Sequence, residues 1–178
     1  MARLKDKYYQ EIRKELMKEL KLENIMEVPR MEKVVLNSGV GEASKDKKFL
    51  DRAMEEIAMI AGQRPIVRQA KKSIASFKIR KGMPVGLQVT LRNYRMYEFI
   101  DRFISIVLPR IRDFKGLARK KFDGAGNYTY ALQDQLVFPE MKFDDVKENR
   151  GMSITFVTSA ETDEAAELLL KKFGLPIV

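Results

Sequence analysis

The stretch from Val85 to Arg92 constrains the fold most, because apolar residues take every second position along it. The apolar positions are Val85, Leu87, Val89 and Leu91, and the positions between them hold Gly86, Gln88, Thr90 and Arg92. A period of two residues is that of a β-strand with one face in a hydrophobic core. The chain therefore requires a sheet whose other face stays open, to water or to a ligand.

Apolar residues elsewhere recur at helical or strand spacing, with turn residues between the segments. The spacing predicts helices over residues 5–22, 46–61, 94–108 and 163–173, the third of them ended by Pro109. Further strands are predicted over residues 31–37, 65–70, 73–79, 128–138 and 151–159. These elements do not alternate regularly, so we expect an α+β fold: a largely antiparallel sheet with helices packed on one face. One domain over residues 1–178 is expected, because two would each be small.

Basic residues are concentrated in the middle third of the chain, whose whole net charge is +9. Residues 64–121 carry 16 Lys and Arg side chains against 3 Asp and Glu. Residues 1–63 carry 13 basic and 12 acidic side chains, and residues 122–178 carry 5 basic and 10 acidic side chains. Solvated surfaces usually mix their charge signs. The asymmetry therefore favours a polyanionic partner over a merely solvated face.

Cysteine and histidine are both absent from the sequence. The lack of cysteine excludes disulfides and thiolate metal sites, which fits a reducing, cytoplasmic compartment. No apolar run approaches the roughly 18 residues of a membrane span, so we expect no membrane partner. The lack of histidine removes the commonest general base and zinc ligand. We therefore expect no enzyme, no catalytic residue, no metal and no cofactor.

Two motifs that can carry chemistry are weak. Gly39-Val40-Gly41 lies between a predicted strand and a predicted helix, as a dinucleotide-binding loop does, but Ser44 replaces its third glycine. A tight turn is favoured, with a nucleotide-dependent phosphotransferase as the alternative. The spacing of Glu140, Asp144, Asp145 and Glu148 matches no metal-binding loop, which favours an exposed acidic loop. A DNA-binding protein is disfavoured, since no predicted helix is strongly basic on one face.

The open face of the predicted sheet offers hydrogen-bonding groups. Its candidate residues are Lys33, Val35 and Asn37 on one strand, and Gln88, Thr90 and Arg92 on another. Such amide, hydroxyl and cationic groups bind RNA sugars, phosphates and base edges, although Thr and Gln are also ordinary strand surface. Residues 70–82 interleave cations and hydroxyls with Phe77, as phosphate-contacting loops do. Phe77 fits a core position equally well.

Several ordered blocks of the sequence are specific. They are KVVLNSGVGEA (33–43), GQRP (62–65), KSIASFKIRKGMPVG (72–86), VTLR (89–92), LPRIRDF (108–114), FDG (122–124), GNY (126–128) and FPE (138–140). Through these blocks, residues 8–173 resemble the bacterial form of the large-subunit ribosomal protein number five family. Three positions depart from residues common in that family: Ser38 replaces methionine, Ala125 a basic residue and Ala131 glycine.

The resemblance implies a structural protein of the ribosome's central protuberance that binds 5S rRNA on its open sheet face and helps attach it to 23S rRNA. It implies that Lys33, Asn37, Gln63 and Thr90 bind 5S rRNA, and the polar-face pattern adds Gln88 and Arg92.

The resemblance also implies that the loop from Lys71 to Val85 reaches the elbow of P-site transfer RNA. The polar residues of this loop are Lys71, Lys72, Ser73, Ser76, Lys78, Arg80 and Lys81. Other surface is implied to contact 23S rRNA and neighbouring ribosomal proteins, including a head protein of the small subunit.

Overall fold

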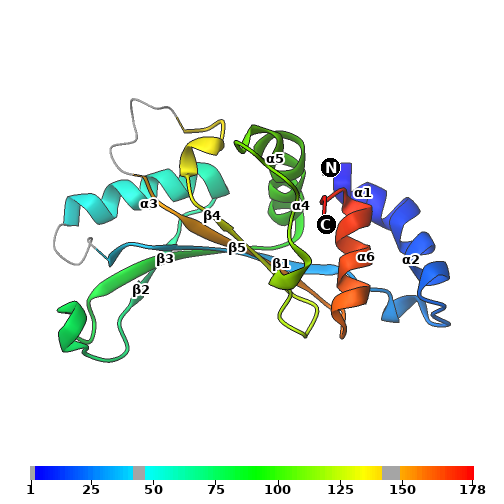
Figure 1. The fold of residues 1–178 in the computed structure, drawn as a ribbon, viewed down its shortest axis with the longest axis horizontal. Coiled ribbons are helices and arrows are strands. Elements are labelled where there is room, and N and C mark those ends of the chain that lie inside the picture. Colours follow the sequence, from blue (N-terminus) through cyan, green and yellow to red (C-terminus); the bar gives the residue numbers. More distant parts are fainter. Residues whose placement is uncertain (1–2, 42–46, 142–148) are drawn as a thin grey trace. The chain divides into compact units, whose positions relative to one another are not determined.

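Five strands form one sheet in the order β2-β3-β1-β5-β4 (Figure 1). The computed structural model describes residues 3–41, 47–141 and 149–178. The strands are β1 (Met31–Gly39), β2 (Ile66–Gln69), β3 (Pro84–Leu91), β4 (Tyr128–Leu132) and β5 (Met152–Thr158). The sheet is antiparallel and accompanied by helices, so the predicted α+β class is confirmed. No helix in the described ranges is long and apolar enough to span a lipid bilayer.

The chain divides into two compact units. The first comprises Met1–Val34, Leu91–Tyr130 and Thr155–Val178, and the second comprises Val35–Thr90 and Ala131–Ile154. Each unit buries apolar residues of its own, from helices and from its share of the strands. Each unit therefore has its own hydrophobic core.

The first unit contains most of the helices. They are α1 (Arg3–Lys7), α2 (Arg13–Glu19), α4 (Asn93–Arg102), α5 (Leu108–Arg110) and α6 (Asp163–Phe173), with π-helical segments joining α1 to α2 and α4 to α5. The N-terminal helix buries Leu4, Tyr8, Ile12 and Leu16. The four-residue apolar spacing that predicts this helix also includes Leu20, which is half-buried and follows the end of α2 at Glu19. The hydroxyl of Tyr8 donates to the Pro29 carbonyl at 2.8 Å, and its ring stacks on Phe173.

Aromatic side chains form the centre of the first unit's core. Phe103 is fully buried and lies 6.2 Å from Phe99, 5.7 Å from Phe156 and 6.0 Å from Tyr130 between ring centroids. The prediction that Pro109 ends its helix is wrong by two residues. The helical backbone continues from the π-helical segment through Pro109 to Arg110.

One helix, α3 (Lys47–Ala61), belongs to the second unit and buries Ala53, Ile57 and Ile60 at the predicted helical spacing. Gly62 follows its end in the left-handed conformation, with φ of 64°. The guanidinium of Arg150 lies 4.1 Å from the ring centre of Phe49 and pairs with the carboxylate of Glu56 at 3.0 Å. This contact ties the residues before β5 to α3.

Two predicted strands are shorter or absent. The prediction of a strand over 128–138 is wrong at its end, because β4 stops at Leu132 and a 3-10 turn follows. The Asp134 carboxylate accepts a hydrogen bond from the Leu136 N–H at 2.8 Å and so favours a turn over an extended chain. Residues 73–79 form a 3-10 turn with one β-bridge, rather than a strand, because Lys78 takes a left-handed conformation.

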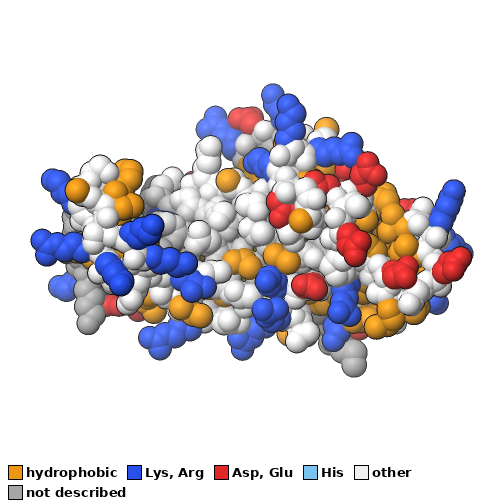
Figure 2. Space-filling view, turned by 90° about the horizontal axis from the view of Figure 1, so that it is seen from below, with side chains coloured by type: hydrophobic (Ala, Val, Ile, Leu, Met, Phe, Trp, Pro, Cys, Tyr) orange, Lys and Arg blue, Asp and Glu red, His pale blue; other side chains and the backbone are white. Residues whose placement is uncertain are grey.

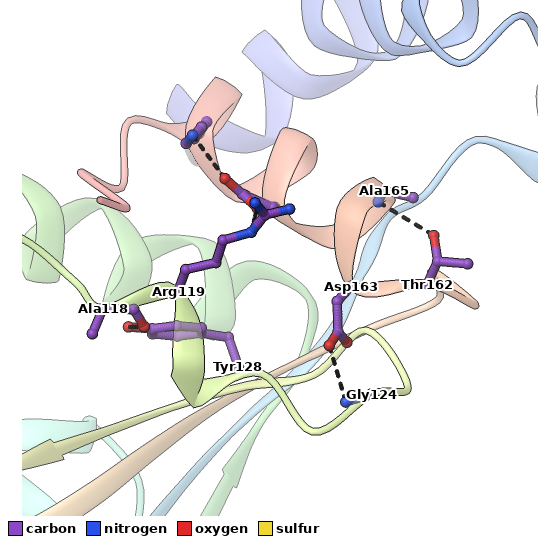
Figure 3. A network of polar contacts seen from close by, with 9 residues as sticks. Ala118, Arg119, Gly124, Tyr128, Thr162, Asp163 and Ala165 are labelled. Carbon is purple, nitrogen blue, oxygen red and sulfur yellow. Dashed lines mark hydrogen bonds and ion pairs between the residues drawn. The ribbon is translucent and has the colours of Figure 1, made fainter.

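Asp163 fixes the turn at residues 123–127 that leads into β4 (Figure 3). Its carboxylate accepts hydrogen bonds from the backbone N–H groups of Gly124 at 3.1 Å and Gly126 at 2.9 Å. Because Asp163 is the first residue of α6, one side chain ties this turn to the start of the helix.

Two further contacts stabilise the surroundings of that turn (Figure 3). The Thr162 hydroxyl accepts from the Ala165 N–H at 3.4 Å and so caps the start of α6. The Tyr128 hydroxyl donates to the Ala118 carbonyl at 3.2 Å, and burial raises the pKa of Tyr128 to about 12. Tyr128 therefore stays neutral, and a donor, at any ordinary pH.

Replacing Asp163 by Ala is expected to lower the free energy of unfolding by about 2 kcal/mol, because the buried Gly126 N–H loses its partner. Urea unfolding measures the change. Glu164→Ala is the matched control, since Glu164 is an exposed carboxylate in the same first turn and its loss removes only a helix-dipole interaction of about 0.5 kcal/mol. Equal losses in the two variants would contradict the role of Asp163 in the turn.

Candidate nucleic-acid interface

Buried and accessible residues alternate along β1 and β3 in the second unit. The buried positions are Leu36, Ser38, Leu87 and Val89. The more accessible positions between them are Val35, Asn37, Gln88 and Thr90. The predicted open face is therefore present here, and we call Asn37, Gln88, Thr90 and the neighbouring Gln63 the open-face patch.

Asn37 and Thr90 offer unused hydrogen-bonding groups. The side-chain amide of Asn37 and the hydroxyl of Thr90 make no hydrogen bond to any residue in the described part of the chain. Gln63 follows α3 and donates its side-chain N–H to the Thr90 carbonyl at 3.3 Å. The fold thus brings Gln63 beside Thr90, although 27 residues separate them in sequence.

Gln88 is oriented by a cation that the sequence patterns did not single out. The Gln88 side-chain oxygen accepts a hydrogen bond from the Arg68 guanidinium. In the antiparallel register, Ile66 lies opposite Gln88, and Arg68 opposite Gly86. Residues directly opposite share a sheet face, so both β2 residues lie on the open face. The pairing register of β2 with β3 places Arg68 on this face, and the sequence alone does not show that register.

Gly86 keeps the open face flat beside Asn37. A Cβ atom at position 86 would lie 3.2 Å from the Ser38 carbonyl oxygen and 4.0 Å from the Asn37 side-chain oxygen. A glycine within a strand often marks close approach of another backbone or ligand. A side chain at position 86 would therefore crowd the Ser38 carbonyl and the Asn37 side chain.

The connection between β2 and β3, residues 70–83, is a hydrogen-bonded structure that we call the basic hairpin. Ala70 N–H donates to the Met83 carbonyl at 2.8 Å, and Ile74 and Ile79 exchange two bonds of 2.9 and 3.1 Å. The Ser73 hydroxyl accepts from the Lys81 N–H at 3.0 Å. These bonds hold the hairpin in shape without a partner.

The polar residues of the basic hairpin are exposed. They are Lys71, Lys72, Ser73, Ser76, Lys78, Arg80 and Lys81, of which Lys71, Lys72, Lys78 and Lys81 are the hairpin lysines. Figure 2 shows Lys and Arg side chains gathered at the left of the view, where this connection lies in Figure 1. Phe77 is 71% exposed, so the core alternative for it is excluded.

Two predicted site residues, Lys33 and Arg92, belong to the first unit. Lys33 is half-buried on β1, at the same strand parity as Val35. Arg92 is exposed and directly precedes α4, in an extended conformation that continues β3 by one residue. Lys33 and Arg92 are therefore described within the first unit, apart from the open-face patch of the second unit.

The weaker motifs gain no support from the geometry. Val40 is buried and its N–H donates to the Val85 carbonyl at 3.0 Å, so Gly39 and Val40 continue the pairing of β1 with β3. The residues that would complete the expected turn, 42–46, lie outside the described residues. Of the four carboxylates in the predicted acidic loop, only Glu140 lies within the described residues. Among those residues, no three acidic side chains are arranged to hold a metal ion.

The three departures from the resembled family lie in different environments. Ser38 is buried, away from the open face, and its hydroxyl donates to the Gly151 carbonyl at 2.9 Å. Ala125 is exposed in the 123–127 turn, and its N–H donates to the Asp123 carboxylate. Ala131 is exposed on β4. The serine therefore adds a polar contact between strands rather than altering the open-face patch.

Two family models match the sequence. Residues 24–80 match the model described as ribosomal protein L5, and residues 84–177 match the model of the C-terminus of the same ribosomal protein family. Together they span both units.

Relatives named large ribosomal subunit protein uL5 are similar along nearly the whole chain. The protein of Acidobacterium capsulatum is 57% identical over 175 residues, which cover 98% of this chain and 96% of the relative. The protein of Desulforamulus reducens is 54% identical over 178 residues, which cover 100% of this chain and 98% of the relative. The Geobacter sulfurreducens protein is 53% identical, over 99% of this chain and 98% of the relative.

Proposed function

This chain belongs to the ribosomal protein L5 family, and from that premise we propose that it binds 5S rRNA through the open-face patch. As a member it is a structural, non-enzymatic constituent of the large ribosomal subunit, and its partners are ribosomal RNA and ribosomal proteins. Its location is accordingly the ribosome, in the cytoplasm. The proposal concerns which RNA is bound and where.

The observation that carries the proposal is the pair of polar side chains at Asn37 and Thr90, which have no hydrogen-bond partner among the described residues and lie near the side-chain-free position at Gly86. A side-chain amide and a hydroxyl both donate and accept hydrogen bonds. RNA presents matching groups as sugar hydroxyls, phosphate oxygens and base edges. Gln88 and Gln63 add two amides to the patch. Lys33 and Arg92, which belong to the first unit, are proposed as further cationic contacts to 5S rRNA.

The basic hairpin is proposed to contact the elbow of P-site transfer RNA. Its four lysines and Arg80 are exposed, and its backbone is already hydrogen-bonded, so ordering it costs little on binding. The exposed ring of Phe77 offers a stacking surface among those cations. We also propose that other surface attaches 5S rRNA to 23S rRNA in the central protuberance and meets a head protein of the small subunit.

Replacing Asn37 by Ala, or Thr90 by Val, is expected to weaken binding of 5S rRNA by about 1 to 3 kcal/mol each, through lost buried hydrogen bonds. Both side chains lack partners among the described residues, so the free energy of unfolding is expected to change little. Filter binding with 5S rRNA measures the affinity, and footprinting of 5S rRNA locates the contact.

Val35→Ala is the control, because Val35 lies on the same face of β1 as Asn37 but has no hydrogen-bonding group. It is expected to bind 5S rRNA within about twofold of the unchanged protein. If Asn37→Ala and Thr90→Val bind as tightly as Val35→Ala, the open-face patch is not the 5S rRNA site. Equal affinity of the unchanged protein for 5S rRNA and transfer RNA would overturn the choice of RNA itself.

A further inference from the structure

A second group of cations surrounds a hollow in the first unit. The hollow has a volume of about 360 Å³ and lies where α1, the start of β1 and the start of α4 come together. Lys5, Arg30 and Arg92 line it, with one carboxylate, that of Glu32. This volume is at the small end of the range for ligand clefts, so it suits one compact charged group.

The three cations are not neutralised within the part of the chain that the structure describes. Among the residues that the structure describes, none of Lys5, Arg30 and Arg92 takes part in an ion pair. Glu32 offsets only one of the three charges. The lining side chains therefore carry a net charge of about +2, and the excess favours an anion.

Tyr97 supplies an unpartnered donor at the wall of the hollow. Its side chain is 5% exposed and lines the hollow, yet its hydroxyl makes no hydrogen bond within the described residues. Burial raises the pKa of Tyr97, and the positive charge of Arg30 acts against that rise. The hydroxyl is not among the fully buried side-chain atoms that lack a partner, so it is accessible from the hollow. In contrast, the hydroxyl of the neighbouring Tyr8 donates to the Pro29 carbonyl.

The start of α4 adds to the positive potential. This ten-residue helix begins at Asn93, and the preceding Arg92 makes no side-chain hydrogen bond to cap it. Both residues line the hollow. The N-terminus of a helix carries a partial positive charge and exposes N–H groups, which favours anions there.

We propose that this hollow binds one phosphodiester group of an RNA backbone, held by Lys5, Arg30 and Arg92 and oriented by the hydroxyl of Tyr97. The proposal rests on the proposed function in taking the polyanion to be RNA. Guanidinium groups match the geometry of phosphate oxygens. A contact to phosphate alone adds affinity without sequence preference. The first unit thereby gains an RNA contact that does not depend on the open-face patch.

The substitution Tyr97→Phe removes only the hydroxyl and so tests its role in binding RNA. The control is Tyr8→Phe, which removes the same group from a neighbouring tyrosine. Tyr97→Phe is expected to weaken RNA binding about three- to tenfold and to leave the unfolding temperature unchanged, because the hydroxyl has no partner among the described residues. Tyr8→Phe is expected to do the reverse, since its hydroxyl bonds Pro29. RNA binding by Tyr97→Phe that equals binding by Tyr8→Phe would overturn the role of the hydroxyl.

The contribution of charge is tested with the double variant Lys5→Gln/Arg30→Gln. The control is the double variant Lys14→Gln/Lys18→Gln, which removes two exposed charges from α2. Affinity is measured from low to high salt for 5S rRNA and for an unrelated RNA duplex of equal length. The first variant is expected to reduce the slope of log affinity against log salt by about 2 for both RNAs. The second is expected to leave it unchanged.

The outcomes separate the two proposals. Equal slopes for the two double variants would overturn the hollow as an RNA site while leaving the open-face patch untouched. A reduced slope for the first variant, with no preference of the unchanged protein for 5S rRNA, would support the hollow and contradict the proposed function. Inorganic phosphate serves as a further probe, and binding as tight as that of RNA would identify a site for free anions and overturn the proposal.

Discussion

Replacement of the four hairpin lysines by glutamine is expected to weaken binding of transfer RNA about 100-fold at about 50 mM salt. Each lysine that neutralises a phosphate releases condensed counterions, so the slope of log affinity against log salt should fall by about 3. All four side chains are exposed, and none forms an ion pair within the described residues. The free energy of unfolding should therefore change little. Fluorescence anisotropy with labelled transfer RNA at several salt concentrations measures both quantities.

The chain offers a matched control for this substitution in its N-terminal helix and the turn that follows it. The control replaces Lys7, Lys14, Lys18 and Lys21 by glutamine, all four of them exposed. Lys21 and Lys78 share a left-handed backbone with φ of 53°, so any backbone effect of the change is matched as well. A control variant that loses as much affinity as the hairpin variant would show an effect of net charge alone and contradict the proposed hairpin contact.

Replacement of Gly126 by Val is expected to lower the free energy of unfolding by about 4 kcal/mol. Gly126 has φ of +75°, and a Cβ atom there would lie 2.5 Å from the Ala160 carbonyl oxygen. The residue cannot move aside, because its N–H donates to Asp163 and its carbonyl accepts from the Thr158 hydroxyl at 2.7 Å. For a chain of this length the unfolding temperature should fall by about 10 °C, as calorimetry would record.

Gly124→Val is the control for the steric part of this effect. Gly124 lies in the same turn with φ of +85°, but no atom lies within 4 Å of the position where its Cβ would be. Only backbone strain is introduced there, and the expected loss is about 1 to 2 kcal/mol. Equal destabilisation by the two substitutions would mean that the turn shifts as a whole, and that Asp163 and Thr158 do not hold Gly126 in place.

Local sequence patterns were enough to predict the helices and strands that bury one face and leave the other accessible. The alternation from Val85 to Arg92 predicts β3 and its open face, and the four-residue spacing from Tyr8 to Leu16 predicts the N-terminal helix. Both patterns work because burial on one side of a regular element repeats with that element's own period. The same argument fails for residues 73–79, where left-handed Lys78 breaks the strand.

Roles within the interface needed the family resemblance as well as the patterns. The polar face pointed to Asn37 and Thr90, whereas Gln63 lies in a connection without periodicity and was singled out only through the resemblance. The structure adds the contact between Gln63 and the Thr90 carbonyl. Assignment of these residues to 5S rRNA stays a prediction until binding is measured.

The sequence by itself determined the α+β class, the order of the main elements, the concentration of cations in residues 64–121 and the polar open face. These properties follow from composition and short-range periodicity. Only the tertiary structure decided that Arg68 orients Gln88 and that Asp163 holds Gly126. It also decided that Tyr97 and Arg30 line the same hollow, where the Tyr97 hydroxyl has no partner among the described residues. Each depends on strand register or on segments tens of residues apart, and no local period encodes which distant residues meet.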